Sequence, residues 1–209
     1  MGRAQGSFSI GSVVPGAVWA AALLLAPFGA AGSGTALSTG TTAAPWLWGI
    51  GAVLLVLVFP WGLVQVLDRR GDLRQSIARA GVGPVILGAA ALCFMLLRLI
   101  LWLDGPQELA AVVFAMIASF TLTLVMPRTW RPDWPALSLG AAVVILPVLL
   151  WAVLPAPAGW LAALVAAILC AGALVLVKNT RSWASMGASA AVGAVVGGGV
   201  FLLLWAASG

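Results

Sequence analysis

Apolar runs long enough to cross a lipid bilayer follow one another along most of the chain, and they constrain its fold more than any other feature. A transmembrane α-helix needs about 20 predominantly apolar residues. Only 7% of the 209 residues are charged and 63% are hydrophobic, whereas an average soluble domain has about 25% charged residues. So few charges could not cover the surface of a soluble protein of this size without aggregation. The sequence therefore predicts an integral membrane protein.

We expect residues 1–209 to form a single all-α membrane domain, a polytopic bundle of about seven transmembrane helices. The first span has a second interpretation, because Arg3 precedes it and Gly29-Ala30-Ala31 resembles the cleavage site of a secretory signal peptide. Cleavage would leave about six helices, but the length of the run favours a retained helix. The expected spans are 11–31, 47–67, 84–103, 107–126, 136–154, 159–177 and 186–207.

A basic segment between the second and third spans predicts the orientation. Residues 68–79, DRRGDLRQSIAR, hold four of the ten Lys/Arg residues, and short loops rich in Lys/Arg stay on the cytoplasmic side. With the amino terminus inside, the inner loops hold nine cations, and the only charged residues of the outer loops are Asp104 and Glu108. We therefore expect a cytoplasmic amino terminus and an outer carboxyl terminus. Abundant Ala, Gly and Arg suggest a GC-rich bacterial genome, hence a bacterial cytoplasmic membrane.

Cations and indoles beside the spans predict anchoring at lipid headgroups. The net charge of +5 could suggest nucleic acid, but the basic residues lie in short loops next to apolar runs, so the lipid bilayer is the expected partner and nucleic acid is not. Indole rings prefer the headgroup level of a membrane. The candidate anchoring residues are Arg69, Arg70, Arg74, Arg128, Trp130, Arg131 and Trp134.

Arg98 is the one cation inside an expected span, and an intramembrane cation is a functional candidate. It could act as a counter-charge for an anionic substrate or a partner subunit. The simpler interpretation is an interfacial arginine whose stem extends outward to pair with Asp104 or Glu108. Asp104 also suits the N-cap of the following helix, and Glu108 suits its first turn.

A row of small residues in the last span predicts a close helix contact. Ser185, Ser189, Gly193 and Gly197 recur every four residues, and such rows let two helix backbones approach closely in a membrane. The contact could be internal, with the span 159–177 and its row of Ala162, Ala166 and Cys170. It could equally be a contact with another subunit or a second copy of the chain.

Absent residue types exclude several chemistries. The chain has no histidine, and no Asp or Glu lies deep in a span, so an imidazole relay and the usual coupling carboxylate are missing. Cys93 and Cys170 lie within spans and are expected to be buried apolar residues. The sequence contains no metal-ligand spacing, nucleophile–base pair or phosphate-binding glycine loop. We expect no catalytic residue, metal or cofactor.

Three functions fit these patterns to different degrees. The first is a non-catalytic membrane subunit or scaffold that packs against partner membrane proteins or forms a homo-oligomer. The alternative is a transporter or channel component for a small uncharged or anionic solute, using Arg98 and kinks at Pro60 and Pro147. An enzyme acting on lipid has least support, because all its carboxylates would lie in loops.

Overall fold

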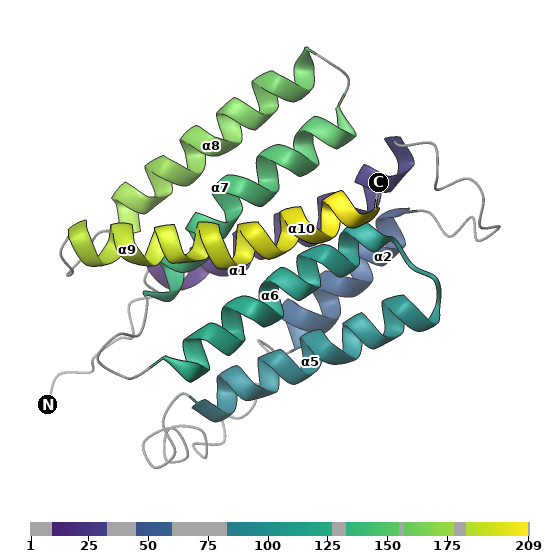
Figure 1. Cartoon of the computed structure of the whole chain (residues 1–209), viewed down its shortest axis with the longest axis horizontal. Helices are drawn as coiled ribbons and strands as arrows, with labels where there is room; N and C mark the ends of the chain where they lie inside the picture. The colour runs from purple at the N-terminus through teal and green to yellow at the C-terminus, as the bar shows by residue number, and fades with distance from the viewer. Residues whose placement is uncertain are drawn as a thin grey trace, which may run out of the picture.

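The computed structural model describes residues 10–32, 45–59, 83–126, 133–154, 157–177 and 183–208. These residues are almost entirely helical, and no strand occurs among them, which confirms the all-α prediction for this part of the chain. The helices are α1 (Ile10–Gly32), α2 (Pro45–Val53) with the π-helix η2 (Leu54–Val58), α5 (Gly83–Trp102), α6 (Gln107–Val125), α7 (Trp134–Val153), α8 (Ala158–Val177), and α9 (Trp183–Gly193) continuing through the π-helix η4 (Ala194–Gly198) into α10 (Gly199–Ser208) (Figure 1).

Three of the described helices are long and apolar enough to cross a membrane: Gln107–Val125, Trp134–Val153 and Trp183–Ala207. They coincide with the expected spans 107–126, 136–154 and 186–207. The other four expected spans overlap shorter apolar helices, at Ala17–Phe28, Trp46–Val58, Leu87–Trp102 and Ala158–Ala173. Pro60 and the basic segment 68–79 lie outside the described residues.

Helices that follow one another along the chain run in opposite directions (Figure 1). The end of α6, the start of α7, the end of α8 and the start of α9 therefore lie at one end of the bundle. The α5–α6 turn, the end of α7 and the start of α8 lie at the opposite end. By sequence, every Lys and Arg except Arg98 falls outside the described helices, and the helix ends that flank residues 127–132 and 178–182 share one end of the bundle.

The central helix is α7, which packs against α1, α8 and α9. Its residues Ala136 through Ala142 are all buried, and so are Ile145, Leu146 and Leu149 further along. A helix that is apolar on every side is the kind that other helices can surround. Pro147 lies inside α7, which continues past it to Val153.

The turn between α5 and α6 differs from the expectation in one respect. Asp104 has a left-handed backbone (φ 48°), and the N–H of Gly105 donates to the carbonyl of Ile100 at 2.8 Å. This is the hydrogen bond of a Schellman motif, with Asp104 at the left-handed position that ends a helix. The prediction that Asp104 caps α6 is therefore wrong: Pro106 is the N-cap and makes no side-chain hydrogen bond.

Candidate functional site

The predicted row of small residues lies at the crossing of α7 and α9. A Cβ atom built on Gly193 would fall on the carbonyl oxygen of Leu137, and one built on Gly140 would fall on the carbonyl oxygen of Ala190. Each helix therefore places a glycine against the backbone of the other. Only a residue without a side chain permits such an approach, which is the contact that small-residue rows provide in membrane helices.

The next turn of the same row continues into η4 and reaches a third helix. A Cβ on Gly197 would lie 2.8 Å from Cβ of Ala141 and 3.1 Å from Oγ of Ser119 on α6. A Cβ on Gly198 would lie 2.7 Å from Cβ of Val144. The internal neighbour of the row is thus α7. The sequence had left open an internal contact with α8 or a contact with another subunit.

Ser189, in the same row, links α9 to the first turn of α7. Its buried hydroxyl donates to the carbonyl of Ser185 at 2.8 Å and accepts a hydrogen bond from the backbone N–H of Asp133 at 2.9 Å. Asp133 is the N-cap residue of α7. A helix start leaves backbone N–H groups without intrahelical partners, so Ser189 supplies a partner just before that start. Ser185 itself is exposed.

Two other buried hydroxyls on α6 bond within their own helix. Ser119 Oγ donates to the carbonyl of Ala115 at 2.8 Å, and Thr123 Oγ1 donates to the carbonyl of Ser119 at 2.9 Å. Because these hydroxyls are satisfied locally, they do not need water or a ligand. Ser138 on α7 differs: it is 0% exposed, and its Oγ has no hydrogen-bond partner in the described structure.

We expect Ser138→Ala to raise the stability of the protein by about 1 kcal/mol, because an unsatisfied buried hydroxyl costs about 1–3 kcal/mol. Ser119→Ala is the matched control on α6, since it removes a hydroxyl that already has a partner. Equilibrium unfolding of both variants in the same detergent measures the difference. A Ser138→Ala protein less stable than Ser119→Ala would show that Ser138 has a partner in solution.

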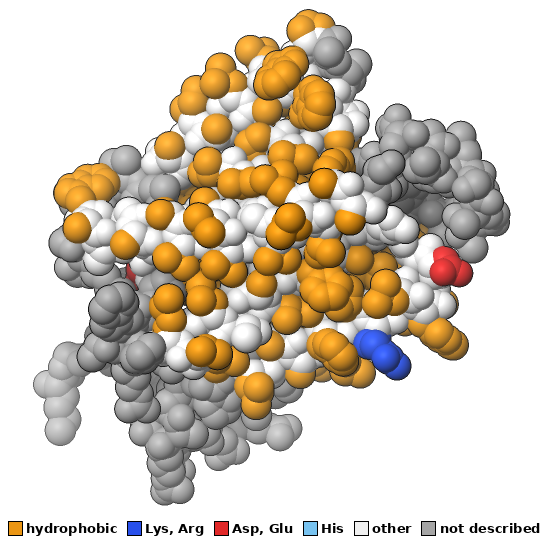
Figure 2. All heavy atoms as spheres, in the orientation of Figure 1, with side chains coloured by type: hydrophobic (Ala, Val, Ile, Leu, Met, Phe, Trp, Pro, Cys, Tyr) orange, Lys and Arg blue, Asp and Glu red, His pale blue; other side chains and the backbone are white. Residues whose placement is uncertain are grey.

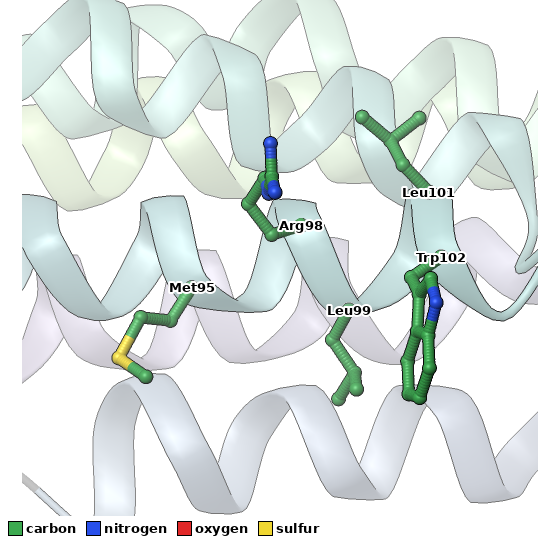
Figure 3. A pocket seen from close by; sticks show the side chains of 5 residues that line it. All are labelled: Met95, Arg98, Leu99, Leu101 and Trp102. Atoms are coloured by element: carbon green, nitrogen blue, oxygen red, sulfur yellow. The ribbon is translucent and has the colours of Figure 1, made fainter.

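Arg98 lies on the outward face of α5 and not inside the bundle. Its side chain is exposed and lines a depression of about 550 Å³ with Met95, Leu99, Leu101 and Trp102, all from the same helix. Figure 3 looks onto this exposed face of α5: Arg98 and Leu101 extend past one edge of the ribbon, and Met95, Leu99 and Trp102 extend past the other edge. In Figure 2 a single blue side chain lies near the edge of a face on which most coloured side chains are orange, that is, hydrophobic.

The two carboxylates proposed as partners for Arg98 lie at the end of this hairpin. Asp104 is exposed in the turn, and Glu108 is half-buried in the first turn of α6 with its Oε2 unpartnered among the described residues. Within the described part of the chain, the structure contains no ion pair between Arg98 and either of them. The Arg98 charge is therefore not compensated by this hairpin.

A second depression, of about 420 Å³, lies between α2 and α5 next to the first. Both depressions include Leu99. Gly51 and Ala52 form part of the floor of the second depression, and a Cβ built on Gly51 would meet no atom within 4 Å. The complete lining is Leu47, Trp48, Gly51, Ala52, Leu55, Leu96, Leu99 and Leu103. Both depressions are open surface features.

Of the candidate anchoring residues, only Trp134 lies within the described part of the chain. It is half-buried and stacks on Phe120 of α6, with ring centroids 4.9 Å apart. The others, Arg69, Arg70, Arg74, Arg128, Trp130 and Arg131, lie outside the described residues.

Possible metal ligands and cysteine thiols are dispersed over the described helices. No group of three or more His, Cys, Asp or Glu residues comes together there, and Cys93 and Cys170 are buried free thiols on separate helices.

Comparison with protein-family models, with curated proteins and with solved structures finds no match for this chain.

Sequence reasoning missed Gly140, which forms half of the α7–α9 crossing. A signal was available, because Ala136 and Gly140 form a small-xxx-small pair in a span that is apolar all round. The same reasoning also passed over Ser138, two residues earlier, whose hydroxyl is a polar exception in the buried run of α7.

Proposed function

We propose that this protein is a non-catalytic integral membrane subunit that packs against partner membrane proteins in a larger complex. We further propose that it spans the cytoplasmic membrane of a bacterium about seven times, with its amino terminus in the cytoplasm. Helices α1, α5 and α8 run for 23, 20 and 20 residues, which is compatible with such spans. In this proposal its role is to position other subunits, and it carries no reaction of its own.

The closed interior around α7 supports this proposal most. Helices meet there backbone to backbone at Gly140 and Gly193, and the hydroxyls of Ser119 and Thr123 are satisfied by their own helix. A transport pathway needs polar groups that line a water-filled cavity. Both depressions described above lie on the surface, beside α5.

The position of Arg98 favours a subunit over a transporter. The transporter alternative requires a polar cavity inside the bundle that reaches this side chain, whereas Arg98 faces outward between exposed apolar side chains. Intramembrane cations usually pair with an acidic group or a backbone carbonyl. An outward-facing cation is thus more useful for contacting another molecule in the membrane than for guiding a solute through this one.

The proposal predicts co-purification with larger membrane proteins. Gentle detergent extraction of the tagged protein from its own host, followed by native mass spectrometry, should give a complex in fixed stoichiometry. Full-length protein that behaves as a stable, lone monomer at native expression level would refute the subunit role. Overexpressed protein, which exceeds the supply of partners, is the matched sample in which free monomer is expected.

A further inference from the structure

The outward face of α5 carries an uncompensated charge on an apolar surface. We call the residues Phe94, Met95, Arg98, Leu101 and Trp102 the Arg98 face; they recur at the three- and four-residue spacing that places side chains on one side of a helix. All five are exposed, and Trp102 is 81% exposed. Trp and Arg are the residue types that most often dominate binding at interfaces.

The backbone of α5 directs the Arg98 stem away from the nearer end of the helix. Arg98 lies four residues before Trp102, so about 6 Å of helix separates it from the end of α5. The Cα–Cβ bond of a helical residue tilts toward the helix N-terminus, which for Arg98 is away from the nearer end. A guanidinium that stays within the apolar layer, instead of extending to the headgroups, is stabilised by an anionic partner that offsets its desolvation.

A second copy of this chain cannot supply that partner well. Symmetric dimers of membrane proteins with the two-fold axis along the membrane normal bring equivalent residues together at equal depth, so two Arg98 side chains would face each other. The described carboxylates lie elsewhere: Asp104 in the turn, Glu108 half-buried at the start of α6 and Asp133 before α7. Among the described residues, a second copy therefore offers no carboxylate at the depth of Arg98.

We propose that the Arg98 face is the docking surface for a transmembrane helix of another membrane protein, and that this helix carries an Asp or Glu at the depth of Arg98. The inference rests on the proposed subunit function and specifies where and how the partner binds. The neighbouring depression between α2 and α5 suits the same partner. Its floor at Gly51 is open, and small residues let a partner backbone approach closely.

The charge contributes specificity as well as binding. A cation on an apolar face repels helices that have no acidic group at the matching depth, because they would leave the guanidinium unpaired. The carboxylate of the partner would be equally dependent on Arg98. Removing either charge leaves the other buried and unpaired, which weakens binding more than the loss of an exposed surface pair does.

Site-specific photocrosslinking in host cells tests this docking surface. A photoreactive amino acid replaces Leu101, which is 61% exposed on the Arg98 face, or Leu169, which is 67% exposed on α8 and serves as the matched control. We expect position 101, and not 169, to crosslink to one transmembrane segment that contains Asp or Glu. Arg98→Gln should reduce that adduct by about tenfold or more, and Arg98→Lys should reduce it less.

Charge reversal then tests the pairing itself. Arg98→Glu should abolish the adduct, and replacing the mapped partner carboxylate with Lys should restore it. Any of four results would overturn the docking surface. These are adducts only to lipid or to a second copy, an adducted segment without a carboxylate, no adduct at position 101, and an adduct that Arg98→Gln does not reduce. A complex that stays intact with Arg98→Gln would also overturn the docking surface, but it would leave the subunit role in place. Lone monomers of the unaltered protein would refute the subunit role itself.

Discussion

Alanine at Gly193 or Gly140 is expected to destabilise the protein by about 3 kcal/mol or more, beyond the usual range for overpacking, because the new Cβ would meet backbone. In both cases that obstacle is a carbonyl oxygen of the facing helix. A backbone carbonyl cannot rotate away as a side chain can, so α7 and α9 must separate. Thermal unfolding in detergent, with the monodisperse fraction from gel filtration, measures the effect.

Gly187 provides the matched control on the same helix, because a Cβ built there would meet nothing within 4 Å. Gly187→Ala should be neutral or stabilising by about 0.5–1 kcal/mol, since Ala is the better helix former. Once one substitution has opened the crossing, the second has less left to disturb. The Gly140→Ala/Gly193→Ala double variant should therefore lose less stability than the sum of the two single variants. Equal tolerance at positions 187 and 193 would contradict the close crossing.

Period and composition were enough to predict helices and their approximate positions, but not which helices meet. The row ending in Gly193 and Gly197 predicted a close helix contact, and in the structure these glycines lie against α7. A second row of small residues, Ala162, Ala166 and Cys170, lies on α8. Local sequence contains no information on which of two such rows is the neighbour. The distinguishing feature was α7 itself, which is apolar on every side and therefore suited to the centre.

The α5–α6 turn shows a different limit of sequence reasoning. Asp104-Gly105-Pro106 is compatible with an Asp that caps the next helix and with an Asp that ends the previous one. The structure adopts the second arrangement, with the Gly105 N–H on the carbonyl of Ile100. Asp104 then belongs to the turn that ends α5, and in the described structure it makes no ion pair with Arg98.

The outward position of Arg98 could not be derived from sequence either. Its neighbours Phe94, Met95, Leu101 and Trp102 are apolar, and an apolar side chain in a membrane span fits a lipid-facing surface as well as a protein core. Hydrophobicity distinguishes inside from outside in water but not in lipid, because the lipid tails are as apolar as the core. Packing partners decide the matter, and those appear only in the three-dimensional arrangement.

The proposed orientation in the membrane predicts a large difference in cysteine labelling between two loops. Ser76 lies in the basic segment 68–79, and Ser38 lies in the uncharged segment between the first two expected spans. With a cytoplasmic amino terminus, Ser38→Cys should react with a membrane-impermeant maleimide in intact cells, and Ser76→Cys only after permeabilisation, with a difference of about tenfold or more.

The native cysteines permit this experiment without a cysteine-free background, since Cys93 and Cys170 are only 0% and 5% exposed. The unaltered protein, which should stay unlabelled in both conditions, measures that background directly. Labelling of Ser76→Cys in intact cells would invert the bundle and place the Arg98 end of α5 at the cytoplasmic face. The other nine cations would then lie on the outer side, and Arg98 alone would lie near the anionic cytoplasmic leaflet. Headgroup contact would then replace a partner carboxylate as the simplest explanation for the charge of Arg98.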